Sequence, residues 1–198
     1  MKKIYLPVFL LILLNFSLLS AESSVEIRAD AFIHSSKLFR KIYGDVGTSY
    51  GIEASTPLVN CFDGWVNFDW FTKNGRSHVD KSEGNGNSEA CRGNTTKVRI
   101  ANFSFGLKFP YEFCGSFSPY VGIGSSLSRI NIKNKSFCCH NKSSKVAFGG
   151  VVKLGIYWRF FECMFLDVFV DYLYQPIKFH KRVDVGGLKT GAGLGISF

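Results

Sequence analysis

The feature of this sequence that most restricts its fold is a period-two alternation of apolar and polar residues. In Lys97–Phe109, for example, Phe103, Phe105 and Leu107 alternate with serine and glycine. Successive side chains of a strand point to opposite faces, so this pattern predicts strands with one apolar and one polar face. Eight segments show it: Val25–Ile33, Gly44–Ala54, Trp65–Thr72, Lys97–Phe109, Pro119–Ile130, Lys145–Trp158, Phe165–Tyr174 and Asp184–Phe198. No stretch with a helical repeat competes with them, and we expect an all-β fold.

Composition agrees with strands. The 198 residues include 20 Phe, 8 Tyr, 3 Trp and 20 Gly, which is typical of strands and turns. With 46% apolar and 20% charged residues, the chain is neither disordered nor a coiled coil, a collagen or a helical membrane protein.

The first 21 residues have the pattern of a secretory signal peptide. Lys2 and Lys3 precede an apolar run from Ile4 to Phe16, and small residues lead to Ala21, the expected cleavage site. The run is too short for a transmembrane anchor. We therefore expect residues 1–21 to be removed and residues 22–198 to form one barrel domain, in a compartment where disulfides can form.

The connections between the eight segments alternate in character. Ser55–Gly64, Pro110–Ser118 and Arg159–Met164 are short and aromatic-rich, whereas His34–Tyr43, Lys73–Thr96, Asn131–Ser144 and Gln175–Val183 are more polar. In an antiparallel meander every second connection lies at the same end. One end is thus expected to be compact and the other irregular, as in outer-membrane barrels with short periplasmic turns and longer outside loops.

A soluble barrel or a β-sandwich has the same alternation, but three features favour a membrane-spanning barrel. The segments have about the 9–11 residues that a tilted spanning strand needs, and the chain ends on an aromatic residue, Phe198. Aromatic residues also gather at strand ends, where a membrane interface favours them: Trp70, Phe71, Phe109, Tyr111, Tyr157, Trp158, Phe160, Phe161, Tyr172 and Tyr174.

The polar faces of the segments carry charges of both signs. In a narrow barrel these side chains would fill the lumen and pair with one another, because unpaired buried charges are costly. The predicted lumen ion pairs involve Glu26, Arg28, Asp30, Glu53, Asp69, Lys108, Lys153, Asp167, Asp171 and Lys189. The competing interpretation is a solvated sheet face.

Two short pieces resemble the small outer-membrane β-barrel proteins, the opacity-protein and OmpA-like family. Pro119–Gly124 reads PYVGIG, and the last eight residues read GAGLGISF, with Phe198 in the position of the terminal aromatic assembly signal. The resemblance implies an eight-stranded antiparallel up-and-down transmembrane β-barrel in the outer membrane of a Gram-negative-type bacterium. It also implies contacts with outer-membrane lipid, lipopolysaccharide and the barrel assembly machinery. Function differs among members and is not inherited with the fold.

Residues for catalysis are sparse, so the chain is expected not to be an enzyme and to need no cofactor. His34 and Ser36 are similar to the His-x-Ser of outer-membrane lipid deacylases, but no acid has the matching spacing. Cys138, Cys139 and His140, with Cys91 and His78, match no zinc motif, and we expect no metal site.

The four polar connections carry 13 basic and 3 acidic residues. Such loops would attract lipid phosphates or polyanionic surfaces such as sulfated glycans, whereas nucleic acid is excluded by the expected location. We therefore predict a structural or surface-interaction role. A soluble secreted or periplasmic barrel that binds an apolar ligand is the main alternative, and an outer-membrane lipid-modifying enzyme is the weaker one.

The six cysteines divide between the two ends of the expected barrel. The short turns hold Cys61, Cys114 and Cys163, and the outer connections hold Cys91, Cys138 and Cys139. A hydrocarbon layer of about 30 Å separates the sets, while a disulfide needs Cα atoms within about 7 Å. Each end therefore keeps an odd cysteine, and we expect it to allow disulfide cross-links to other envelope proteins.

Overall fold

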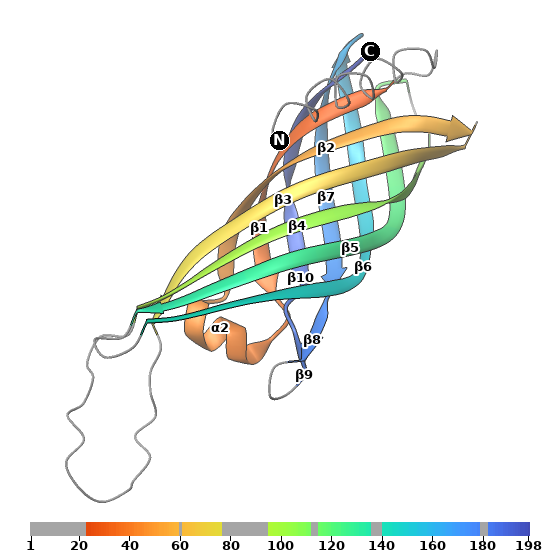
Figure 1. The fold of residues 1–198 in the computed structure, drawn as a ribbon. Helices are drawn as coiled ribbons and strands as arrows, with labels where there is room; N and C mark the ends of the chain where they lie inside the picture. The colour runs from red at the N-terminus through yellow and green to blue at the C-terminus, as the bar shows by residue number, and fades with distance from the viewer. Residues whose placement is uncertain (1–22, 60, 77–94, 112–114, 136–139, 179–181) are drawn as a thin grey trace, which may run out of the picture.

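The computed structural model describes residues 23–59, 61–76, 95–111, 115–135, 140–178 and 182–198. Eight long strands close into one antiparallel barrel, ordered β1-β10-β7-β6-β5-β4-β3-β2 (Figure 1). They are β1 (Ser24–His34), β2 (Val46–Val59), β3 (Phe62–Arg76), β4 (Thr95–Pro110), β5 (Phe117–Lys135), β6 (His140–Phe161), β7 (Met164–Tyr174) and β10 (Gly187–Ser197). The predicted all-β, eight-stranded architecture is confirmed.

The first and last strands close the barrel. They pair antiparallel from Ser24 opposite Ser197 to His34 opposite Gly187. Beyond them, the backbone N–H of Phe198 donates to the Ser23 carbonyl, and the Ser23 N–H donates to the Phe198 carbonyl. The start of β1 and the C-terminus thus lie at one end of the barrel, together with the short turns β2–β3, β4–β5 and β6–β7 (Figure 1).

The outer wall of the barrel is apolar. The alternation places large apolar side chains outward on every strand, with exposed fractions from 38% for Leu188 to 69% for Ile27. The face includes Ile27, Ile52, Phe68, Trp70, Phe103, Phe105, Val121, Ile123, Leu127, Phe148, Val152, Leu154, Val168, Val170, Leu194 and Ile196. So much contiguous apolar surface is compatible with contact with lipid, not with water. Among the described residues no helix is long and apolar enough to cross a membrane.

Several strands run further outward than the alternation suggested. The residues 131–135 and 140–144, expected in a loop, continue β5 and β6, which are 19 and 22 residues long. Their register is unbroken out to Lys135 opposite His140. Outside the membrane an apolar outer face is no longer needed, so the strands continue with polar residues on that face.

Two small elements at the outer end were not expected from the sequence. A helix, α2 (Lys37–Tyr43), follows β1, and a hairpin of β8 (Pro176–Lys178) and β9 (Arg182–Asp184) follows β7. Ser36 caps the helix by accepting a hydrogen bond from the N–H of Phe39. The sequence pattern predicted strands alone and gave no sign of this helix, although the all-β class holds. A seven-residue helix is too short to be stable alone, and this one is held by packing against the barrel mouth (Figure 1).

Some predicted features lie outside the described residues. These are the signal peptide with its cleavage site at Ala21, and the cysteines Cys91, Cys114, Cys138 and Cys139. The division into residues 1–21 and 22–198 stays a prediction.

Candidate functional site: the barrel interior and its outer mouth

The inward faces of the strands bring the ten predicted lumen charges together. Glu26, Arg28 and Asp30 come from β1, Glu53 from β2, Asp69 from β3, Lys108 from β4, Lys153 from β6, Asp167 and Asp171 from β7, and Lys189 from β10. All ten are buried. Each sits at the parity opposite to the lipid-facing residues of its strand, which is why the alternation could locate them.

Glu53 is the centre of the charge network. Its Oε2 lies 2.5 Å from Nη1 of Arg28, its Oε1 lies 2.6 Å from Nζ of Lys108, and Lys153 also donates to Oε2. The side-chain amide of Asn67 donates to the same carboxylate at 3.0 Å. One buried carboxylate therefore neutralises cations from three strands, β1, β4 and β6.

Arg28 links Glu53 to the far wall. Its Nη2 lies 3.1 Å from Asp171 Oδ2 and 3.8 Å from Asp167 Oδ2, and its guanidinium stacks 3.4 Å from the centre of the Phe169 ring. Tyr120 donates its hydroxyl to Asp167 at 2.9 Å. These contacts brace β1 against β5 and β7 across the lumen.

Glu26 and Asp30 are held less directly. Glu26 lies 3.6 Å from the Nε of Arg28, and Asp30 accepts a hydrogen bond from the Ser49 hydroxyl. For these two acids the pairing with bases is weaker than predicted from the sequence.

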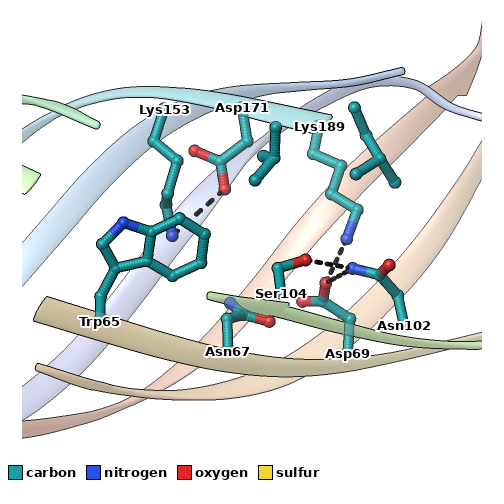
Figure 2. Close-up of a pocket in the computed structure, with 10 residues that line it drawn as sticks. Trp65, Asn67, Asp69, Asn102, Ser104, Lys153, Asp171 and Lys189 are labelled. Atoms are coloured by element: carbon teal, nitrogen blue, oxygen red, sulfur yellow. Dashed lines mark hydrogen bonds and ion pairs between the residues drawn. The ribbon is translucent and has the colours of Figure 1, made fainter. Parts of the chain in front are cut away.

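Nearer the outer end, side-chain amides and hydroxyls surround one remaining ion pair. Lys189 pairs with Asp69 at 2.5 Å, and Asn102 donates to the same carboxylate at 3.1 Å (Figure 2). Gln175 donates to Asn102 Oδ1 at 3.0 Å and to Ser126 at 2.9 Å. These amides and serines were not among the predicted site residues, although their inward-facing positions in the alternation could have identified them.

Little space remains between these side chains. One pocket, lined by Trp65, Lys153, Asp171 and Lys189 among others, leaves about 10 Å³, and a neighbouring one against Phe32 and Gln175 leaves the same. That is room for one water molecule in each. The interior at this level is packed, as expected for eight strands.

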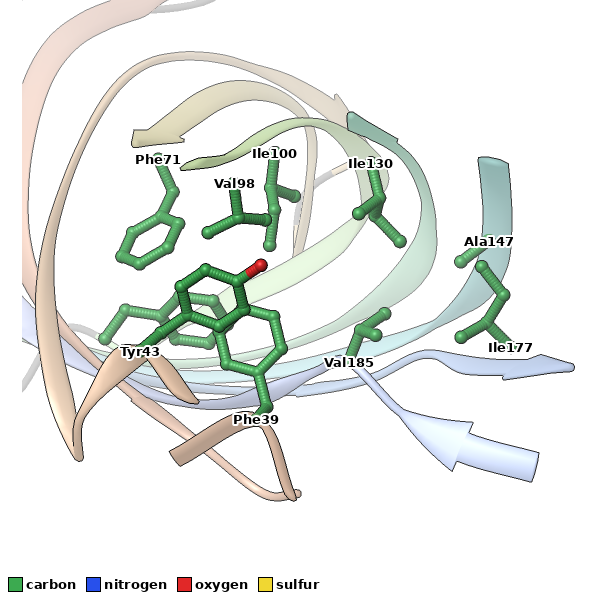
Figure 3. Packing of buried hydrophobic residues seen from close by; sticks show 10 residues of the cluster. Phe39, Tyr43, Phe71, Val98, Ile100, Ile130, Ala147, Ile177 and Val185 are labelled. Atoms are coloured by element: carbon green, nitrogen blue, oxygen red, sulfur yellow. The ribbon is translucent and has the colours of Figure 1, made fainter. Parts of the chain in front are cut away.

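An apolar cluster closes the outer mouth. Inward residues of the strands meet side chains of α2 and of the β8–β9 hairpin (Figure 3). The cluster comprises Phe32, Phe39, Tyr43, Phe71, Val98, Ile100, Ile130, Ala147, Ile177 and Val185. Phe71 was expected at the membrane interface and instead faces this cluster. Tyr157 was expected there too, but it faces the lumen, where it contacts Lys108.

His34 and Ser36, the pair similar to a lipid-deacylase motif, both have structural roles in this fold. His34 is buried among Phe32, Phe39 and Phe71, with ring centres 4.1, 4.0 and 5.0 Å away, and is not a solvated loop residue. Ser36 caps α2.

Burial raises the pKa of Tyr43, the last residue of α2, to about 12, so this hydroxyl stays neutral beside the cluster.

The remaining predicted site residues lie on the other end. Phe198 is 72% exposed. Cys61 and Cys163 are exposed and unbridged, in the β2–β3 and β6–β7 turns. Within the described part of the chain, no group of three or more His, Cys, Asp or Glu residues is placed to hold a metal ion.

Comparison with known proteins places this architecture. No family model matches the chain, and no curated protein matches it. Among solved structures, Neisserial surface protein A shares 17% identity at a TM-score of 0.60, over 90% of this chain and 96% of that one. The chain has the fold of the eight-stranded outer-membrane β-barrels.

Two further barrels show the same likeness. Ail, the attachment invasion locus protein of Yersinia pestis, was crystallised with the heparin analogue sucrose octasulfate. It is 15% identical at a TM-score of 0.55, over 88% of this chain and 98% of that one. The N-terminal barrel domain of Pseudomonas aeruginosa OprF is 18% identical at a TM-score of 0.53, over 90% and 100%. The resemblance inferred from the sequence is thus confirmed for the fold.

Proposed function

We propose that this protein is a non-enzymatic barrel of the bacterial outer membrane, with a structural and surface-interaction role and no solute channel. The observation that carries the proposal is the combination of a closed, lipid-compatible outer wall with an interior filled by ion pairs. A soluble barrel that binds an apolar ligand would have the opposite arrangement, with an apolar cavity inside and charges outside.

The interior argues against a general porin. Glu53 and its three cations cross the lumen, the apolar cluster covers the outer mouth, and the two described lumen pockets are each the size of a water molecule. A hydrated solute would have to disrupt both the ion-pair network and the apolar cluster. The surfaces of this barrel that are available to bind partners are therefore its outer end and its outer wall.

The outer end supports recognition of polyanions. Lys37 and Lys41 are exposed on α2, and Arg40 is partly exposed, while the helix has no acidic residue in its first turn. The four polar connections of the sequence add to this basic surplus. Ail, which has the same fold, was crystallised with a sulfated sugar. Sulfated glycans or lipopolysaccharide phosphates are therefore the partners we propose for this end.

Location and conductance are tested together. The protein is expressed in a Gram-negative host, membranes are fractionated, and intact cells are treated with protease. We expect outer-membrane fractionation, a band that shifts on unboiled gels, and cleavage in residues 77–94. Purified protein in planar bilayers should give no stable wide conductance. Such a conductance, or a detergent-independent soluble form, would overturn the proposal.

Polyanion binding is tested with heparin. Folded protein in detergent is titrated with heparin at several salt concentrations, beside a K37Q/R40Q/K41Q variant. We expect the variant to bind more weakly and with a shallower salt dependence, because fewer cations contact the polymer. Equal binding by the two proteins would contradict a role for α2.

A further inference from the structure

The outer wall of β4 and β5 changes character abruptly above the apolar belt. Along β5 the outward positions read Leu127, Arg129, Asn131 and Lys133, and along β4 they read Phe103, Ala101, Arg99 and Lys97. Leu127 lies opposite Phe103 in the register, so the apolar face ends at the same height on both strands. Four cations, Lys97, Arg99, Arg129 and Lys133, begin directly beyond it.

The register makes these cations neighbours. Lys97 lies directly opposite Lys133, Arg99 opposite Asn131, and Arg129 opposite Ala101. Directly opposite residues have Cβ atoms about 5 Å apart, and same-face residues along a strand are about 7 Å apart. The four side chains therefore form one patch about 13 Å long from Arg129 to Lys133.

No carboxylate of the described residues balances the patch. The flanking outward positions are Thr72 and Asn74 on β3, and Ser144 and Val146 on β6. Within the described ranges, none of the four cations makes an ion pair or a side-chain hydrogen bond. The bases in the lumen of the same protein are paired with acids, and the four cations on the outer wall differ from them in having no acidic partner among the described residues. Like charges directly opposite in a sheet are destabilising, and a bound anion would remove the repulsion.

We propose that Lys97, Arg99, Arg129 and Lys133 form a binding site for the phosphate groups of a lipid headgroup in the outer leaflet, a phosphorylated glycolipid. The position of the patch selects a lipid over a free anion. Arg129 lies between Ala101 and Val146 in the register, at the upper edge of the apolar wall. Acyl chains would lie against Phe103, Leu127 and Phe148, which are 44%, 46% and 66% exposed, while the headgroup reaches the guanidinium groups. Arginine suits this contact because its planar fork binds phosphate oxygens bidentately.

This inference rests on the proposed outer-membrane location. Its test uses full-length folded barrel in detergent, titrated with bis-phosphorylated lipid A and measured by native mass spectrometry. The R99Q/R129Q variant is expected to bind lipid A about tenfold more weakly or worse, because two charged contacts are removed. The R159Q variant removes an exposed arginine near the opposite end of the barrel, at the end of β6, and is expected to bind like the wild type. An R99K/R129K variant should bind between the two.

The outcomes separate the site from the function. Equal lipid A affinity in R99Q/R129Q and wild type would overturn the site while leaving the proposed function intact. Displacement of lipid A by millimolar inorganic phosphate, or equal binding of phosphatidylcholine, would overturn a phosphorylated lipid as the ligand. Failure of the wild type to fold into phospholipid bilayers, seen as the absence of a heat-shifted band, would overturn the proposed function and the inference with it.

Discussion

Replacing Glu53 with Gln tests whether local pairing or total charge controls the stability of the lumen. The ten lumen charges comprise six acids and four bases. By total charge alone, E53Q moves the interior closer to neutrality and should stabilise the barrel. By local geometry, it removes the one carboxylate that contacts Arg28, Lys108 and Lys153.

The geometry gives the expected magnitude. Removing one partner of a buried ion pair costs about 3–5 kcal/mol, because the other charge remains buried without compensation. Glu53 serves three cations. Without it Arg28 keeps three other acids within 4 Å, namely Glu26, Asp167 and Asp171, and Lys153 keeps Asp171. Among the described residues Lys108 has no second acid within 4 Å. We therefore expect a loss of about 5 kcal/mol in the free energy of unfolding, the upper end of that range.

Urea unfolding of the folded barrel in lipid vesicles, followed by tryptophan fluorescence, measures this loss. Glu162→Gln, at an exposed turn position, is the matched control and should change stability by less than about 0.5 kcal/mol. Adding Lys108→Met to E53Q should recover part of the loss, because the cation left without its acid is removed. A destabilisation by E53Q no larger than that of E162Q would refute the local-pairing argument.

Three further predictions concern the two ends of the barrel. Changing Phe198 to Asp should impair assembly, because a charge replaces a 72% exposed terminal aromatic residue; the folded fraction on unboiled gels measures this, and wild-type assembly would contradict it. Cys61 and Cys163 lie in turns on opposite sides of the barrel, too far apart to bridge each other. We therefore expect them to give disulfide-linked oligomers that disappear with reductant. A monomer band unchanged by reductant, in membranes whose thiols were blocked before lysis, would argue against cross-linking. The raised pKa of Tyr43 means that the folded state favours the neutral phenol, so its contribution should hold below pH 10 and be lost between pH 10 and about 12. Urea unfolding of the folded barrel should show the wild type losing stability relative to Y43F across that range, and equal pH profiles of the two proteins would contradict the assignment.

The alternation by itself determined the number of long strands, their two faces and the residues that line the interior. Each of these depends only on chain parity: once a strand is extended, every second side chain shares a face, and an apolar face must meet lipid or a core. Glu53, Lys108 and Lys153 could be assigned to the interior on that basis alone. The antiparallel order from β1 through β7 to β10 followed because consecutive long segments of the chain pair with each other, whereas the closing pair of β1 and β10 joins the two ends of the chain.

Only the tertiary structure decided which charges meet and what closes the mouth. Lys153 and Glu53 are 100 residues apart in the chain, and their contact depends on the tilt and stagger of the closed barrel, which strand parity does not contain. The helix α2 is likewise too short to be read from local propensity, since it is stabilised by burying Phe39 and Tyr43 against strands distant in sequence. The cation patch on β4 and β5 belongs to the same class, because Lys97 and Lys133 become neighbours only through the register that the barrel imposes.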